Sequence, residues 1–200
     1  KNGKALIAVL DMILYVLWLT IFSLILMYFF HDKASAVIIN GEEYWEEMYW
    51  WLAGAPAKES TPSQFIPEHI KHMVIVAVAS LASAGMLALL FGTVLMNYMN
   101  YYVSQLMLNS SKPLLMAVIG WHPWSICRVV SFIILGCALA WPLVSRFGKG
   151  EKIDARKFKI MVGIAIGLEI LDILLKTFIG PGWRELLLVN LNESLGVMVD

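Results

Sequence analysis

The chain has 200 residues, of which 60% are apolar and 15% charged, and its mean hydropathy is +0.73. Soluble domains are about half apolar and about a quarter charged, so this composition excludes a water-soluble globular domain. Its 15 basic and 15 acidic residues give a formal net charge of zero, which argues against nucleic acid as a partner. We therefore expect an all-α, polytopic integral membrane protein.

Four apolar stretches are long enough to cross a bilayer, whose hydrocarbon core of about 30 Å requires about 20 helical residues. The whole chain, 1–200, is interpreted as one membrane domain, a four-transmembrane-helix bundle with interfacial helices. The predicted spans are residues 5–30, 72–98, 125–144 and 158–179.

The connections between these spans also give structural signals. Loop 31–71 contains an acidic and aromatic stretch, 42–52, which is expected to form a short helix at the headgroups or on a partner. Residues 113–122, which end before Pro123, are expected to form an interfacial or re-entrant segment. The sequence Gly-Pro-Gly after the fourth span predicts a helix stop, so residues 181–200 are expected to form an amphipathic interfacial helix.

The orientation signals conflict with one another. Loop 146–159 is rich in Lys and Arg, and short basic loops favour the cytoplasmic side of a plasma or inner membrane. With the four predicted spans, this loop and the N-terminus would lie on opposite sides. Lys1 and Lys4 therefore favour the opposite orientation.

Small residues recur at helical spacing in two of the spans. In the second span they predict one smooth stripe against which another helix packs, and in the fourth they form a GxxxG spacing. These residues are Ser80, Ala84, Ala88 and Gly92 in the second span, and Gly163 and Gly167 in the fourth.

The fourth span carries three charged residues within apolar sequence. Glu169, Asp172 and Lys176 lie three, four or seven positions apart, so they share one helix face. A charge at the bilayer centre costs about 2.5–3.5 kcal/mol on insertion scales, so this face is expected to point into protein, with Lys176 pairing with Asp172 or reaching the headgroups. Asp11 in the first span, by the same argument, could contact Lys176 or Arg128.

Two further groups are candidates for ligand binding. One contains a carboxylate and imidazoles near the start of the second span and the end of the first, and it could bind a metal ion or, through two histidines, a haem. Its members are His31, Glu68, His69 and His72. The other could contact a quinone or a lipid headgroup through aromatic rings, and consists of Trp121, His122 and Trp124.

Three classes of function account for these features, and the cofactor is left open. The first is a non-catalytic subunit that assembles with other integral membrane subunits through the small-residue stripe and the charged face. The second is a redox or metal-binding subunit of a membrane enzyme, which would use the histidine group. The third is a small proton- or ion-coupled transporter that uses Asp11, Glu169 and Asp172.

Overall fold

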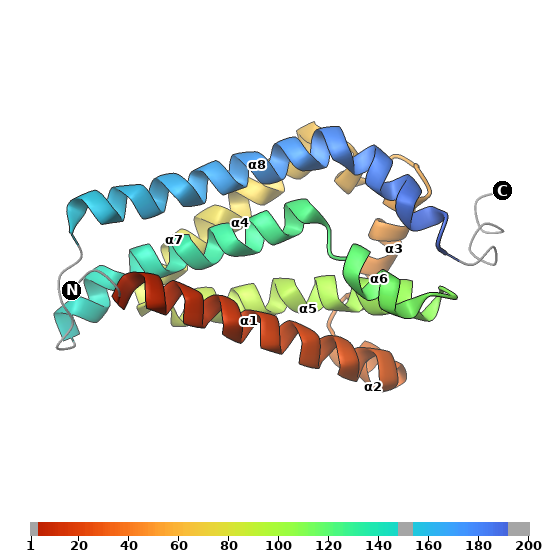
Figure 1. The fold of residues 1–200 in the computed structure, drawn as a ribbon, viewed down its shortest axis with the longest axis horizontal. Coiled ribbons are helices and arrows are strands. Elements are labelled where there is room, and N and C mark those ends of the chain that lie inside the picture. The colour runs from red at the N-terminus through yellow and green to blue at the C-terminus, as the bar shows by residue number, and fades with distance from the viewer. Residues whose placement is uncertain (1–3, 148–153, 192–200) are drawn as a thin grey trace. The chain divides into compact units, whose positions relative to one another are not determined.

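A computed structural model describes residues 4–147 and 154–191, and every regular element in these residues is helical (Figure 1). The all-α fold is therefore confirmed for the described part of the chain. The elements are α1 (Lys4–Phe29), α2 (His31–Val37), α3 (Gly41–Leu52), a 3-10 turn (Lys58–Ser60), α4 (Pro62–Ser83), α5 (Met86–Leu108), α6 (Pro113–Ile119), α7 (Pro123–Phe147) and α8 (Ala155–Leu188).

Four of the described helices are long and apolar enough to cross a membrane, and they make the chain an integral membrane protein in contact with lipid. They are the segments Leu6–Phe29, Pro62–Ser83, Met86–Leu108 and Pro123–Arg146. The first and last of these match the predicted first and third spans. Helix α8 includes the predicted fourth span, 158–179. Because its apolar stretch carries Glu169, Asp172 and Lys176, α8 is not one of these four apolar helices.

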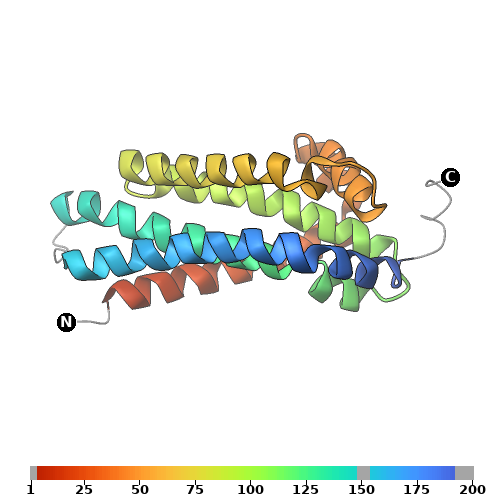
Figure 2. The same ribbon diagram turned by 90° about the horizontal axis from the view of Figure 1, so that it is seen from above.

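The predicted span 72–98 is wrong, because the chain reverses direction in its middle. Ala84 and Gly85 have φ angles of 52° and 92°, values that end a right-handed helix. The Gly85 amide donates a hydrogen bond to the Ser80 carbonyl (3.1 Å), which closes α4 with a Schellman motif. The Ser83 hydroxyl then accepts a hydrogen bond from the Leu87 amide (2.8 Å) in the first turn of α5. Figure 2 shows α5 running back along α4.

This hairpin also overturns the predicted small-residue stripe. Ser80 is fully buried on α4, Ala84 lies in the turn, and Ala88 is buried near the start of α5. A side chain added at Gly92 would meet nothing within 4 Å. The four residues therefore do not form one helix face.

The left-handed conformation of Ala84 leads to a stability prediction. An L-residue pays about 1–2 kcal/mol for this conformation, whereas glycine adopts it freely and loses about 0.5–1 kcal/mol through backbone entropy. We expect Ala84→Gly to raise the free energy of unfolding by about 0.5–1 kcal/mol. Ala82→Gly, two residues earlier in helical backbone, should lower it, so equal effects of the two changes in a detergent unfolding titration would contradict the turn geometry.

Two other boundaries differ from the sequence prediction. Helix α4 begins at Pro62, ten positions before the predicted start. Proline suits the first position of a helix, because the backbone N–H that it lacks would have no hydrogen-bond partner within the helix there. Helix α8 continues through Gly180, Pro181 and Gly182 to Leu188, so the predicted stop is wrong. The interfacial helix predicted at 181–200 is thus the end of α8 in its described part, and residues 192–200 lie outside the described residues.

The loop segments agree with the prediction more closely. Helix α3 (Gly41–Leu52) coincides with the predicted short helix at 42–52. Helix α6 has 7 residues, too few to cross a bilayer, and adjoins α5 through Gly120, where an added Cβ would lie 3.1 Å from Leu106. Residues 103–122 therefore do not form a further crossing.

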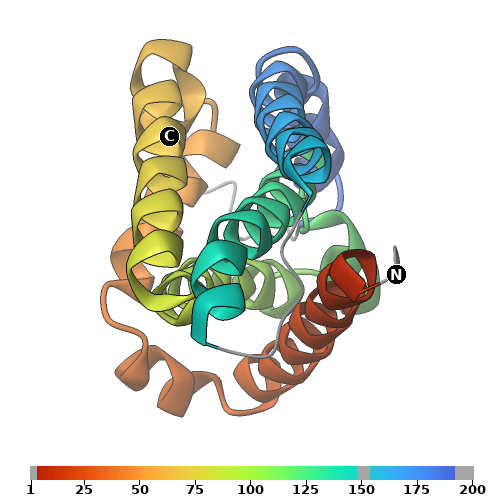
Figure 3. The same ribbon diagram turned by 90° about the vertical axis from the view of Figure 1, so that its left-hand side faces the viewer.

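The chain divides into two compact units, and the boundaries between them fall within α1, α4, α5 and α8. Unit 1 comprises Lys1–Trp18, Glu68–Val94 and Pro123–Leu174, and unit 2 comprises Leu19–Pro67, Leu95–His122 and Leu175–Asp200. The core of unit 1 contains one buried apolar residue from each of α4, α5, α7 and α8, with α7 beside α8 in Figure 3. These residues are Val76, Ala88, Leu135 and Ala165.

The core of unit 2 is rich in aromatic side chains. Tyr102 of α5 is fully buried, with its ring centroid 6.0 Å from that of Trp45 in α3. The indole of Trp183 in α8 donates a hydrogen bond to the Ile119 carbonyl (2.9 Å), which holds α6 in place. The acidic and aromatic helix α3 therefore packs on helix α5 of its own chain.

Candidate functional site

One face of α8 is buried although it carries three ionisable groups. Ala165, Glu169, Asp172 and Lys176 follow each other at intervals of four, three and four residues, and each is no more than 5% exposed. The prediction that Glu169 and Asp172 face protein is confirmed. Gly163 and Gly167 lie off this face, and a side chain added at either would meet nothing within 4 Å.

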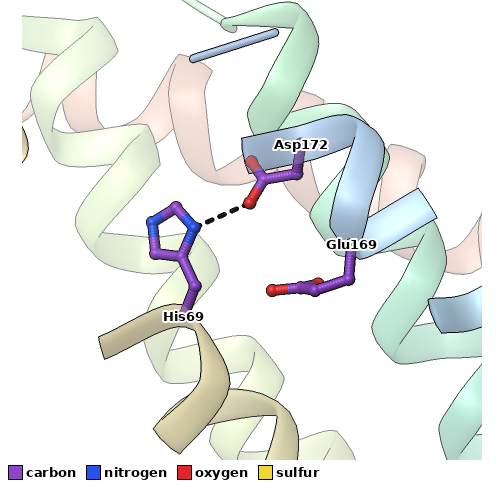
Figure 4. A group of neighbouring side chains, drawn as sticks. All are labelled: His69, Glu169 and Asp172. Atoms are coloured by element: carbon purple, nitrogen blue, oxygen red, sulfur yellow. Dashed lines mark ion pairs between the residues drawn. The ribbon is translucent and has the colours of Figure 1, made fainter. Parts of the chain in front are cut away.

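Asp172 is the centre of a polar cluster that lies wholly within unit 1. Arg128 of α7 donates two hydrogen bonds to its carboxylate, from Nε to Oδ2 (3.2 Å) and from Nη2 to Oδ1 (3.0 Å). His69 of α4 approaches the same carboxylate, with Nδ1 at 2.7 Å from Oδ2 (Figure 4). Three helices therefore meet at one fully buried carboxylate.

Glu169 lies one turn before Asp172 on α8, and its carboxylate extends toward the same space (Figure 4). It is 4% exposed, and neither of its oxygens accepts a hydrogen bond from any described residue. The neighbouring Ser131 hydroxyl has a single proton and lies 2.8 Å from the Ala165 carbonyl, so it can donate to Glu169 only by giving up that bond. A buried carboxylate is thus left without the hydrogen bonds that such a group ordinarily has.

His69, Glu169 and Asp172 together have the arrangement of a cation site. Each offers one ligand atom, and these atoms all lie within 4.8 Å of one another. Because Arg128 offsets the charge of Asp172, an ionised Glu169 beside a neutral His69 leaves the cluster one negative charge in excess. In that protonation state the site would favour a positively charged ligand.

Lys176 belongs to a different polar contact, so the predicted pairing with Asp172 is wrong. In unit 2 its ammonium group binds the carboxylate of Glu59 and lies 4.3 Å from the ring centroid of Phe65. Burial raises the pKa of the nearby Glu47, and the negative charge of Glu59 raises it further, while Lys58 and Lys176 lower it. Sequence spacing identified the buried lysine but not its partner, which precedes it by 117 positions.

Of the four residues predicted to bind a metal or haem, only His69 belongs to the group that it forms with Glu169 and Asp172. Glu68 is exposed and binds Lys71. The ring of His72 packs 5.6 Å from that of Phe91. In unit 2, His31 stacks on Tyr101, with a centroid distance of 5.9 Å.

The predicted quinone or lipid contact is mostly enclosed by protein. His122 and Trp124 are 1% and 2% exposed, and only Trp121 is partly exposed. Nε2 of His122 lies 3.2 Å from the Tyr102 hydroxyl, and its ring lies 5.1 Å from that of Trp51 in α3. The contact between His122 and α3 arises because the turn at Ala84 and Gly85 adds a reversal, which brings α5 and His122 back to α3.

Asp11 is exposed on α1, so the expectation that it faces protein is not met within the described residues. The two cations that it was expected to contact bind Asp172 and Glu59 instead. Arg128 is the site residue that the sequence analysis underrated, although an arginine six residues into an apolar helix was a visible signal.

Comparisons with protein-family models, with curated proteins and with solved structures found no match for this chain.

Proposed function

We propose that this chain is a small proton- or ion-coupled membrane transporter that binds and releases a cation at His69, Glu169 and Asp172. The observation that carries the proposal is the buried carboxylate of Glu169, which accepts no hydrogen bond from the described residues. The site lies against two of the four membrane-spanning helices, α4 and α7, and ionisable residues at membrane depth are costly and typically mark ion pathways or proton relays. A bound cation would supply the contact that Glu169 lacks.

A purely structural role accounts for only part of the cluster. Arg128, Asp172 and His69 connect α7, α8 and α4, which is what a static polar link between helices requires. Glu169 adds little to that link, since neither of its oxygens has a hydrogen-bond partner among the described residues while Ser131 donates to Ala165. Burying this carboxylate is unfavourable in free energy, and helix packing does not offset it, whereas a bound cation would.

The number of apolar helices supports the further proposal that loop 146–159 is cytoplasmic. If α1, α4, α5 and α7 each cross once, the N-terminus and this loop lie on the same side of the membrane. Lys1, Lys4 and the basic loop then act together under the positive-inside rule. We propose that this side faces the cytoplasm, at a plasma or inner membrane; residues 1–3 and residues 148–153 of the loop lie outside the described residues.

The proposal is tested by flux into proteoliposomes that contain either a pH-sensitive or a metal-sensitive dye. We expect the wild-type chain to carry a cation down an imposed gradient. Glu169→Gln should lower the rate at least about tenfold, because it keeps the size of the side chain but removes its charge. Glu185→Gln makes the same change at an exposed position of α8 and should leave the rate unchanged.

Two outcomes of the flux experiment would contradict transport. One is that wild-type vesicles show no more flux than empty vesicles for protons, sodium or divalent ions. The other is that Glu169→Gln and Glu185→Gln behave alike while both remain folded, as judged by size-exclusion chromatography.

A second candidate, a non-catalytic subunit of a larger membrane complex, is favoured by α1. Only 11% of the most apolar part of its 24-residue span is buried within the protein, and Asp11 of this helix is exposed. A carboxylate in contact with acyl chains costs several kcal/mol, and a partner helix would remove that cost. A photo-crosslinker at position 11, activated in native membranes, should then give protein adducts, whereas adducts with lipid alone would contradict this candidate.

A further inference from the structure

We infer that the cation held by His69, Glu169 and Asp172 is a divalent transition metal ion, of the class of Mn²⁺, Fe²⁺, Co²⁺ and Zn²⁺. This inference rests on the proposed function, because it names the cation of the same site. The sequence alone predicts His69 as a metal ligand, but together with other residues, His31, Glu68 and His72.

The donor set is the first argument. One imidazole and two carboxylates form a mixed nitrogen and oxygen set of the kind that Zn²⁺ and its neighbours take in proteins. Ca²⁺ and Mg²⁺ are bound through oxygen atoms alone, so a histidine at the centre of the site argues against them. All three donors are buried, at 2%, 4% and 0% exposure, so water does not compete freely for the ion.

The geometry is the second argument. The ligand atoms lie within 4.8 Å of one another. Bonds of about 2.1 Å in a tetrahedral site place ligand atoms about 3.4 Å apart, so a pair of atoms near the 4.8 Å limit would have to close by about 1.4 Å. Glu169 already extends toward the space beside His69 and Asp172 (Figure 4), and its side chain has several rotatable bonds through which it could move closer.

The surroundings of Asp172 are the third argument. Carboxylate ligands of metal sites are themselves held by outer hydrogen bonds, and Arg128 supplies two of these to Asp172. The side chain of Arg128 is 20% exposed, so its charge is partly hydrated, and each oxygen of Asp172 keeps a second lone pair with which it could bind the ion. Because Arg128 already offsets the charge of Asp172, the uncompensated negative charge at the site would come from Glu169.

Titration of the purified chain of residues 1–200 with Co²⁺ in mild detergent, after treatment with a chelator, tests this inference. We expect one Co²⁺ per chain, with a visible absorption spectrum typical of mixed nitrogen and oxygen ligands that disappears when Zn²⁺ is added. Glu169→Gln should weaken Co²⁺ binding at least about tenfold, whereas Glu185→Gln should not change it. Glu169→Asp keeps a carboxylate on a shorter side chain and should bind Co²⁺ more tightly than Glu169→Gln.

The result that overturns the inference is a folded wild-type chain that takes up no Co²⁺, or one whose Co²⁺ affinity is the same in Glu169→Gln. If such a chain still shows proton flux that depends on Glu169, the site serves protons and the transporter proposal survives. If Co²⁺ binds through Glu169 but vesicles show no flux of any cation, transport fails and the metal site stands. Should Glu169→Gln not fold, the wild-type stoichiometry and the Glu169→Asp variant decide the matter.

Discussion

Replacing Arg128 with methionine is expected to lower the free energy of unfolding by about 3–5 kcal/mol, because it leaves the buried carboxylate of Asp172 without its counter-charge. Asp172 is 0% exposed and accepts two hydrogen bonds from Arg128. Methionine retains much of the arginine stem, so the loss is one of charge and hydrogen bonding. The measurement is a detergent unfolding titration that compares the variant with wild type.

Two further variants make this result specific. Arg146→Met removes an exposed arginine from the same helix and should change stability by less than about 1 kcal/mol. Combining Arg128→Met with Asp172→Asn removes both charges and should restore most of the loss, because no unpaired charge remains. If the double variant is as unstable as Arg128→Met, the Arg128 side chain stabilises the protein by packing and not through Asp172.

Glu59→Gln is expected to destabilise unit 2 by about 1–3 kcal/mol, because it leaves the ammonium group of Lys176 buried without a counter-charge. The Lys176 side chain is 3% exposed and that of Glu59 is 25% exposed, so water screens this pair more than it screens Asp172 and Arg128. The ring of Phe65 at 4.3 Å supplies a weaker second contact to the ammonium group.

The neighbouring Lys58 supplies a matched control. It is exposed and adjacent to Glu59, so Lys58→Met should have little effect in a thermal unfolding assay. Lys176→Met combined with Glu59→Gln should be more stable than Glu59→Gln alone. If Glu59→Gln and Lys58→Met give the same small change, the contact between Lys176 and Glu59 contributes nothing to stability.

Composition and hydropathy were enough to predict an all-α membrane protein, because the length of an apolar segment directly reflects bilayer thickness. They failed at Ala84, where small residues at four-residue spacing predicted a packing stripe and in fact surround a turn. The signal for that turn was Gly85, two residues after Ser83, but the residue that adopts the first left-handed conformation is Ala84, and alanine rarely does so. Pro181 was misleading in the opposite sense, because α8 continues through it.

The burial of Glu169 and Asp172 was predictable from the cost of a charge in hydrocarbon, but their partners were not. Helical periodicity relates residues on one helix, so it suggested Lys176 as the partner of Asp172. The actual partners, His69 and Arg128, come from α4 and α7. Only the packing of three helices brings them together, and no spacing within one segment encodes that contact.

The most direct test of a cation site formed by His69, Glu169 and Asp172 is X-ray diffraction from wild-type crystals grown with Zn²⁺, recorded with its anomalous signal. We expect one strong anomalous peak within about 2.0–2.2 Å of a ring nitrogen of His69 and of an oxygen from each carboxylate, with Arg128 still bound to Asp172. An experimental structure in which Glu169 points into lipid, or in which Zn²⁺ binds elsewhere and leaves these three residues without a peak, would contradict the account.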